Sequence, residues 1–403
     1  MKILHVLAQK PTRTGSGVYF SNVIEGLKKY GHEQAAIFAL QDDFVFDVLP
    51  ADSQYPVYFK SAALPFAVAG MSDVMPYENT IYSTMSNDMI NAWRAVFSGV
   101  LEQAKAEFAP DVVILHHLWW LTSMAVDVFD AARKIGICHN TDLRQAEQNP
   151  DLKEKYVHGL EKLDLVLSLS DDAKPRIELT FGISRDKIVT LGGGFNQNVF
   201  YPEGTPQQVR GDKKVNIAYA AKVERSKGIF ELVEAFKMVA AADHHLHIIG
   251  TPDTANKAKL DALTHGMDNI SLVHITNQKH LADYMRTCDI YVMPSFYEGL
   301  GLIAIEALAS GLFVVATEID ALMALLGETV NNSGIIEYVP LPRIWGTDKP
   351  VEEDIPVFIN NLANKLKAQI NRAGTGDGIS PALLKEIHKH SWDAKTKIIN
   401  DLL

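Results

Sequence analysis

The chain has 403 residues, of which 47 % are hydrophobic and 22 % are charged. This composition excludes a disordered chain, a collagen-like repeat and a coiled coil, and the length predicts two or three domains. The formal net charge of −11 argues against nucleic acid as a partner, since no concentrated basic stretch offsets it.

The cysteines and the first residues indicate the compartment. The two cysteines, Cys138 and Cys288, cannot build a disulfide framework or a cysteine-based zinc site. The apolar start of the chain ends at Gln9 and Lys10, which is too early for a signal peptide and typical of a buried strand. No apolar run reaches the roughly 20 residues that a membrane-spanning helix needs. We therefore expect a cytoplasmic protein without a membrane partner.

Short apolar runs rich in β-branched residues alternate with longer amphipathic stretches, which is typical of strand-helix-strand units and parallel sheets. In the first half, the segment 41–100 fits this scheme poorly and predicts a long irregular insertion. The region 17–30 has the pattern of a helix. Strands are predicted at 2–8, 34–40, 111–115, 135–139, 163–169 and 187–191.

The second half repeats the same alternation. Its strands are predicted at 215–221, 245–250, 270–275, 289–294 and 312–317. Its helices are predicted at 227–241, 278–287, 300–310 and 380–403.

Two such series in tandem need two sheets, so the chain requires a domain boundary. Three consecutive glycines, Gly192, Gly193 and Gly194, give the backbone freedom to change direction and predict an interdomain hinge. We place the first domain at 1–195 and the second at 196–384.

The segment 294–311 leaves a predicted strand, passes a loop with two glycines and enters a helix. Ligands bind at the carboxyl ends of strands in open parallel sheets, and Gly299 and Gly301 would let backbone N–H groups approach a ligand there. Glu298 and Glu306 could accept paired hydroxyls of one sugar-like ligand. Alternatively, Glu298 stabilises the helix start and Glu306 is a solvated helix residue. The apolar neighbours of Glu306 favour a bound partner.

In its full form this segment reads Glu-Gly-x-Gly-x-x-x-x-Glu-Ala-x-Ala-Ser-Gly, from Glu298 to Gly311. It resembles the signature of retaining nucleotide-sugar glycosyltransferases with the GT-B fold, the family 4-like group similar to sucrose-phosphate synthase and bacterial glycogen synthase. The resemblance extends over nearly the whole chain. It implies an α/β protein of two Rossmann-like domains, with parallel sheets that face each other across a cleft.

The resemblance also implies roles for the residues of this segment. Glu306 would accept the ribose hydroxyls of the nucleotide, and Glu298 would hold the transferred sugar. Backbone amides of Gly299, Leu300 and Gly301 would assist in binding the donor.

A second match is the segment 221–228, Ala-Lys-Val-Glu-Arg-Ser-Lys-Gly, which follows a predicted strand and precedes a helix. The family pattern is Gly-Arg, three to four residues, then Lys-Gly, and its two cations neutralise the donor diphosphate. The matching cations are Lys222 and Lys227. Because Lys222 stands where the family has arginine, bidentate phosphate binding is lost although the charge remains. Arg225 could be recruited instead, and Lys227 could equally be an exposed lysine at a helix start.

The first half carries two further matches. Gly15 and Gly17 resemble the family's glycine loop beside the phosphates and acceptor, although Phe20 occupies the third-glycine position of a dinucleotide fingerprint. His139, at the end of a predicted strand, matches the family histidine that contacts the donor sugar. A lone histidine at a strand end is more often a satisfied core residue, so both interpretations are kept.

Acceptor-binding residues are also predicted in the first half. His116 and His117 resemble a family segment near the acceptor cleft. Adjacent residues on a strand point to opposite faces, so at most one of them would face the cleft, and we favour His116. Arg144 could meet an anionic acceptor or could be a surface cation.

The ends of the second domain resemble the family as well. Residues 198–202 resemble the start of the nucleotide domain, and Ser391-Trp392 resembles the terminal helix that crosses back. We therefore assign 385–403 to the first domain. There is no Walker A loop, no His-Glu-x-x-His motif and no convincing Asp-x-Asp site, so we expect no metal and no cofactor beyond the nucleotide sugar.

The sequence as a whole predicts a retaining hexosyltransferase that moves a sugar from a UDP- or GDP-type donor to a hydroxyl of a soluble small molecule or saccharide. His139, Lys222, Lys227 and Glu298 would be catalytic, with the lysines stabilising the leaving diphosphate. No covalent nucleophile stands out, so we expect front-side displacement in which the leaving phosphate oxygen helps to deprotonate the acceptor. A sugar-nucleotide epimerase or phosphorylase, or a noncatalytic nucleotide-sugar-binding subunit, are the alternatives. The donor base, the sugar, the acceptor and the oligomeric state stay open.

Overall fold

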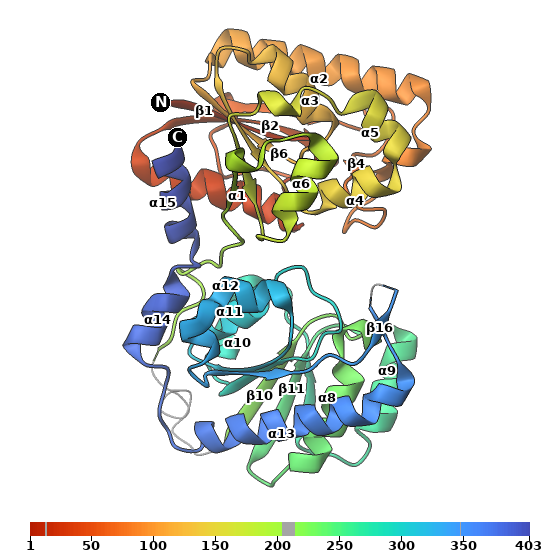
Figure 1. Ribbon diagram of the computed structural model, residues 1–403. Helices are drawn as coiled ribbons and strands as arrows, with labels where there is room; N and C mark the ends of the chain where they lie inside the picture. The colour runs from red at the N-terminus through yellow and green to blue at the C-terminus, as the bar shows by residue number, and fades with distance from the viewer. Residues whose placement is uncertain (13, 204–213, 347) are drawn as a thin grey trace. The chain divides into compact units, whose positions relative to one another are not determined.

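The computed structural model describes residues 1–12, 14–203, 214–346 and 348–403. Its contacts divide the chain into two compact units (Figure 1). Unit 1 holds Met1–Gly193 and Lys395–Leu403, and unit 2 holds Gly194–Ala394. Each unit has a parallel sheet with helices around it, as the alternating sequence pattern predicts.

Unit 1 is built on a seven-stranded parallel sheet with the order β3-β2-β1-β6-β7-β8-β9. Its central strands are buried along nearly their whole length, which explains why they read as continuous apolar runs. In the register of the two central strands, Ile3 lies opposite Val112. The strands are β1 (Lys2–Leu7), β2 (Glu33–Leu40), β3 (Gln54–Tyr58), β6 (Val112–His116), β7 (Arg133–Ile137), β8 (Leu165–Ser168) and β9 (Ile188–Thr190), with a separate short pair, β4 (Ala69–Gly70) and β5 (Thr80–Ile81).

The helices of unit 1 connect these parallel strands. The first begins after Thr14, whose side chain accepts a hydrogen bond from the backbone N–H of Gly17. The helices are α1 (Gly15–Leu27), α2 (Asn87–Phe108), α3 (Trp120–Val128), α4 (Thr141–Gln148), α5 (Pro150–Tyr156), α6 (Ala173–Phe181) and the returning α15 (Trp392–Leu402). None of the helices in the described ranges, in either unit, has the length and apolar character needed to cross a membrane.

Unit 2 has a six-stranded parallel sheet with the order β12-β11-β10-β13-β14-β15. The strands are β10 (Val215–Ala220), β11 (His244–Ile249), β12 (Ile270–Val273), β13 (Ile290–Met293), β14 (Phe313–Thr317) and β15 (Ile336–Val339), followed by a hairpin of β16 (Ile344–Trp345) and β17 (Lys349–Pro350). The helices are α8 (Ile229–Val239), α9 (Thr254–Leu263), α10 (Gln278–Met285), α11 (Leu302–Ala309), α12 (Asp320–Asn331), α13 (Ile355–Ala373) and α14 (Pro381–His388). Helices α8 and α13 pack together on one face of the sheet, and α10, α11 and α12 lie on the other (Figure 1).

The predicted irregular insertion at 41–100 is wrong in two places. Strand β3 pairs with β2 at the sheet edge, where Pro56 is tolerated because an edge strand can lack one donor. Helix α2 begins after Ser86, whose side chain accepts from Met89 N, and it buries a stripe that includes Trp93 and Phe97. Strand β15 was also not predicted. All the strands that were predicted are present, and their ends differ from the predicted ends by no more than two residues.

The chain passes between the units at the glycines that were predicted as a hinge. A Cβ atom on Gly194 would lie 2.8 Å from Cδ2 of Trp392, so the indole needs a glycine there. Phe195 N donates to His390 O at 3.1 Å, and Trp392 N donates to Phe195 O at 2.9 Å. These contacts keep the chain up to Ala394 in unit 2.

The C-terminal segment 385–403, predicted as one helix that belongs to the first domain, is therefore divided. Helices α14 and α15 are separated by the bridge between Phe195 and Ser391, and only Lys395–Leu403 is part of unit 1. There Thr396 packs against Gly26, where a Cβ atom would lie within 2.4 Å of its side chain. His32 and Asn400 also share a hydrogen bond of 2.8 Å.

Candidate functional site

Each sheet has one point where its strand order reverses. In unit 1, β1 lies beside β6, and in unit 2, β10 lies beside β13, although each pair is far apart along the chain. The connections leave such neighbours in opposite directions and open a crevice at their carboxyl ends, where ligands bind in this class of sheet. The residues after β10 and β13 include Lys222 and Glu298, and those after β1 and β6 include Gln9 and His117.

In unit 2 the loops 221–228 and 294–301, which follow β10 and β13, lie against each other. Gly228 has φ +65° and directly precedes helix α8, and a Cβ atom on it would lie 2.0 Å from the carbonyl oxygen of Pro294. Phe296 N donates to Ser226 O at 2.9 Å. The glycine of the Lys-Gly motif is therefore required by the close approach of the two loops.

Replacement of Gly228 with alanine should strongly destabilise unit 2. The variant must adopt a left-handed backbone with a side chain and must also move the Pro294 carbonyl, which together cost about 3 kcal/mol. Urea unfolding measures this difference. The matched control is Gly299→Ala in the facing loop, where a Cβ atom meets nothing within 4 Å. Equal unfolding free energies for the two variants would contradict the loop contact.

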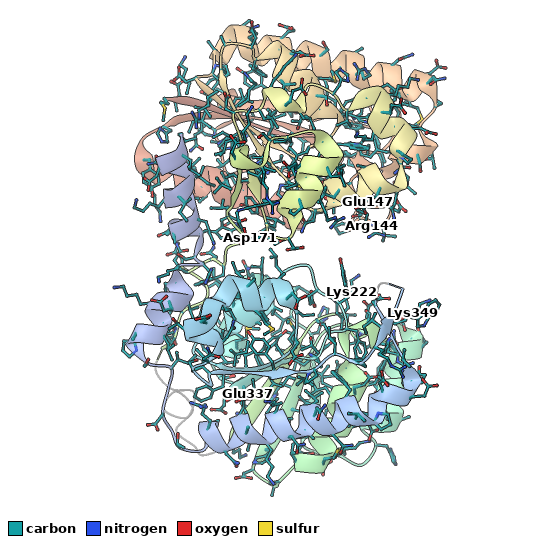
Figure 2. The ribbon with its side chains drawn as sticks, viewed as in Figure 1. Arg144, Glu147, Asp171, Lys222, Glu337 and Lys349 are labelled. Atoms are coloured by element: carbon teal, nitrogen blue, oxygen red, sulfur yellow. The ribbon has the colours of Figure 1, made fainter. Side chains whose placement is uncertain are left out.

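The two loops bring together three of the predicted residues around one cavity. Lys227 Nζ lies 2.9 Å from Glu298 Oε1, and Ser295 Oγ donates to the same oxygen at 2.8 Å. Lys222 is exposed on the side of unit 2 that carries the β16–β17 hairpin (Figure 2). The cavity has a volume of about 430 Å³ and is lined by Ala221, Lys222, Glu224, Ser226, Lys227, Tyr297, Glu298 and Asp348. Lysines and hydroxyl-accepting carboxylates thus meet in a space the size of a small-molecule site.

Arg225, the alternative cation, is directed elsewhere. Its guanidinium lies 2.6 Å from Glu352 and 3.6 Å from Glu231. It is not among the described residues that line the cavity, so Lys222 and Lys227 are the cations in place.

Helix α11 positions the second glutamate of the motif. Gly301, with φ +67°, directly precedes this helix, and the preceding Gly299 leaves open space beside the backbone. Leu300 is half-buried between them. Glu306 lies on α11 and accepts a hydrogen bond of 3.0 Å from Gln278 Nε2 on α10. Although the residue keeps some exposure, desolvation of the carboxyl raises the pKa of Glu306 to about 8, and the bond from Gln278 offsets this only in part.

In unit 1 the structure brings three histidines together at the ends of β6 and β7. His116 Nδ1 lies 3.2 Å from His139 Nε2, and the ring centroids of His117 and His139 are 4.6 Å apart. The strand pattern predicts opposite faces for His116 and His117, with at most one of them facing the cleft, yet both rings lie close to His139. His117 has left the strand with φ +72°, so the alternation of side chains along β6 no longer applies to it.

Asp142 holds this histidine cluster in place. Its carboxylate is fully buried and accepts from His117 Nδ1 at 2.8 Å, from Leu118 N at 2.9 Å and from His139 N. Burial would raise the pKa of Asp142, but the charge and hydrogen bond of His117 outweigh it and hold the pKa at about 2. Burial lowers the pKa of His139 to about 3 and that of His116 well below its usual value, so both rings are neutral at pH 7.

Replacement of Asp142 with asparagine should cost about 3 kcal/mol of unfolding free energy, because an amide cannot accept from all these buried donors. The folded pKa is depressed, so the carboxylate stabilises the protein above about pH 4, and this contribution is lost as the pH falls towards 2. Urea unfolding at pH 6 and pH 3.5 should show a smaller deficit at the lower pH. The exposed Asp151→Asn is the control. A deficit that does not change with pH would contradict the assignment.

The other predicted residues of unit 1 have separate positions. A Cβ atom on Gly17 would lie 2.4 Å from Thr12 O, so a tight turn explains this glycine, whereas Gly15 has open space around it. Arg144 is exposed on α4 (Figure 2), and no ion pair joins it to the part of the chain that the structure describes. Its predicted contact with an anionic acceptor stays a prediction.

Several residues of these sites were not found from the sequence. Gln9 Oε1 lies 3.1 Å from His117 Nε2 and accepts from Ser16 Oγ at 3.0 Å. The Tyr19 hydroxyl donates to Gly192 O at 3.2 Å, and its ring packs edge-on against His139. Gln9 follows β1, the neighbour of β6 in the sheet. Knowledge of the strand order would therefore have indicated that Gln9 lies near His117. The described residues contain no group of three or more His, Cys, Asp and Glu side chains that could hold a metal ion.

Comparison with known proteins shows that the chain is similar to glycosyltransferases. Residues 203–340, most of which belong to unit 2, match the family of group 1 glycosyl transferases. An uncharacterized glycosyltransferase of Methanocaldococcus jannaschii is 23 % identical over 393 residues, which cover 91 % of this chain and 93 % of that protein. The resemblance to glycosyltransferases drawn from the motifs is thereby confirmed.

Solved structures confirm the predicted GT-B fold. Sucrose-phosphate synthase from Thermosynechococcus elongatus superposes with a TM-score of 0.66 at 17 % identity, covering 100 % of this chain and 98 % of that chain. The HepE protein of Anabaena in complex with UDP-glucose superposes with a TM-score of 0.59 at 13 % identity and covers 100 % of this chain and 99 % of that chain.

Proposed function

We propose that this group 1 glycosyltransferase transfers a sugar, with retention of configuration, from a nucleoside diphosphate sugar to a hydroxyl of a soluble small molecule or saccharide. The observation that carries the proposal is the cavity of unit 2, where Lys222 and Lys227 lie beside Glu298 at the point where the strand order reverses. Binding of a diphosphate requires cations, and binding of a sugar requires groups that accept hydrogen bonds from its hydroxyls. The cavity offers both.

Each part of the donor has a partner in unit 2. Lys222 and Lys227 would neutralise the diphosphate, helped by the backbone N–H groups of the glycine loop at the start of α11. Glu298 would accept hydroxyls of the transferred sugar, and Glu306 those of the ribose. This assignment uses no metal, since the lysines supply the positive charge that the leaving group requires.

The transfer itself exchanges one bond to the anomeric carbon for another. The bond from this carbon to the β-phosphate oxygen breaks, and the bond to the acceptor oxygen forms on the same face. The acceptor proton passes to the leaving phosphate oxygen, so the diphosphate departs with the bonding electron pair. His139, neutral at pH 7, would hydrogen-bond a sugar hydroxyl and orient it for this step.

The experiment is a thermal unfolding screen with UDP, GDP and ADP, followed by their sugars. A nucleotide that binds the folded protein at 100 times its Kd stabilises it by about 2.7 kcal/mol. The sugar of the stabilising nucleotide is then tested with an acceptor panel. Transfer with retained configuration is the expected result.

Four results would contradict the proposal. No stabilisation by any of the nucleotides or nucleotide sugars would exclude the donor site. Conversion of the nucleotide sugar without an acceptor would indicate an epimerase, and a requirement for inorganic phosphate would indicate a phosphorylase. Binding of a donor without turnover on any acceptor would indicate a noncatalytic subunit.

A further inference from the structure

The lysine assigned to the donor diphosphate already has an anionic partner in unit 2. Lys227 Nζ lies 2.9 Å from Glu298 Oε1, and it also donates to the backbone oxygen of Tyr297 at 3.3 Å. Both side chains of the ion pair are only about one-fifth exposed, at 22 % and 21 %. A charge pair at this depth is screened less by solvent than a surface pair.

Glu298 is held on this lysine by the protein itself. Ser295 Oγ donates to the same Oε1 atom at 2.8 Å, and the backbone of Ser295 is fixed by Thr317 Oγ1, which donates to Ser295 O at 2.7 Å. Ser295 and Thr317 are both buried. The carboxylate is therefore positioned on Lys227 before any ligand binds.

The charges around the cavity also disfavour a bound anion. Among the described residues that line it, two lysines face three carboxylates, those of Glu224, Glu298 and Asp348. Glu224 accepts from Ser226 Oγ at 2.8 Å, so its charge stays in the cavity wall. A diphosphate must compete with Glu298 for Lys227 in this surrounding.

We propose that Glu298 acts as an exchangeable counter-ion of Lys227 that lets the site distinguish a nucleotide sugar from the free nucleoside diphosphate and so promotes product release. This inference rests on the proposed function. When the donor binds, sugar hydroxyls replace Lys227 as partners of Glu298, and the diphosphate takes Lys227. After transfer the hydroxyls leave with the product, Glu298 returns to Lys227, and the diphosphate loses its cation. The specificity of the site is the difference between its affinity for the nucleotide sugar and its affinity for the free diphosphate.

Calorimetric titration tests this with whichever of UDP, GDP and ADP most stabilises the wild type. Glu298→Gln removes the competing charge and should bind the free diphosphate about tenfold more tightly, a change of ~1.4 kcal/mol. The same variant should not bind the nucleotide sugar more tightly, because it loses the hydroxyl acceptor. Ser295→Ala removes the hydrogen bond that holds Glu298 on Lys227 and should tighten diphosphate binding to a smaller extent. This variant provides the test if Glu298→Gln does not fold.

Asp348→Asn is the matched control, since it removes the same charge from the same cavity without touching Lys227. We expect it to change diphosphate affinity by about twofold or less, because no ion pair joins Asp348 to Lys227 among the described residues. Unchanged or weaker diphosphate binding by Glu298→Gln, or equal tightening by Asp348→Asn, overturns the inference. If the wild type binds the diphosphate and Lys227→Met weakens it, the proposed function stands in either case. If the wild type binds neither a nucleotide nor a nucleotide sugar, the proposed function and this inference fail together.

Discussion

Replacement of Lys227 with methionine should lower the turnover number by about a thousandfold, the scale of losing one preorganised charge at a leaving group. Methionine keeps most of the side-chain length but cannot neutralise the diphosphate or pair with Glu298, which lies 2.9 Å from Nζ in the structure. Because the developing charge on the diphosphate is largest in the transition state, turnover should fall more than donor affinity. Steady-state kinetics with a saturating acceptor measure both.

The control for this variant is Lys257→Met on α9, a lysine that pairs with Asp261 on the surface. It should retain wild-type turnover and nearly wild-type stability, since exposed pairs of this kind contribute little. Wild-type turnover in Lys227→Met would exclude the assigned role of the lysine.

Replacement of Glu306 with glutamine should separate activity from stability. Glutamine cannot accept two ribose hydroxyls as a carboxylate does, so donor affinity and turnover together should fall by about a hundredfold. In the free protein the pKa of Glu306 is about 8, so the carboxyl is mostly protonated at pH 7, and donor binding to the ionised form should release a proton. Calorimetry in two buffers of different ionisation enthalpy detects this proton in the wild type and should not detect it in the variant.

Although Glu306→Gln should lower activity, it should raise the stability of the protein at neutral and higher pH. The folded pKa of about 8 lies above the ordinary value of 4.5, so the stabilising contribution of Glu306 is complete below about pH 4.5 and is lost as the pH rises through 8. Glu306→Gln has no such titration and should become more stable than the wild type between pH 5.5 and pH 8.5.

Urea unfolding at these two pH values measures the crossover, with the exposed Glu328→Gln as control. If Glu306 had only a structural role, the variant would be less stable than the wild type at both pH values. The wild type would then release no proton when the donor binds. That result would contradict the assignment of Glu306 to the nucleotide.

The most predictable part of the fold consists of strands buried on both faces, because these are continuous apolar runs of four to eight residues, as in β1, β2, β6, β13 and β14. The edge strand β3 escaped detection because it contains Pro56 and is only partly buried. Helix α2 escaped because scattered prolines and aromatics precede it in the insertion. The division of the C-terminal segment depends on the packing of Trp392 on Gly194, a contact between residues far apart in the chain.

The candidate site divides in the same way. The sequence identified four candidate residues because each belongs to a motif of fixed spacing that contains glycines in a loop: Lys222, Lys227, Glu298 and Glu306. Their partners could not be found by spacing, since the contact between Lys227 and Glu298 spans 71 residues and arises only when β10 and β13 become neighbours.

The partners in unit 1 were missed for a related reason. Asp142 and His117 are 25 residues apart: His117 directly follows β6, and Asp142 lies in the first turn of α4, after β7. The position of His117 beside His139 has a local cause, because its positive φ cannot be read from the pattern of a strand.

The most direct test of the donor site is a crystal structure of the protein with a bound nucleotide sugar. The account predicts a diphosphate oxygen within hydrogen-bond distance of Lys227 Nζ, the transferred sugar on Glu298 and the ribose on Glu306. A nucleotide bound elsewhere, with the ion pair of Lys227 and Glu298 intact, would contradict it.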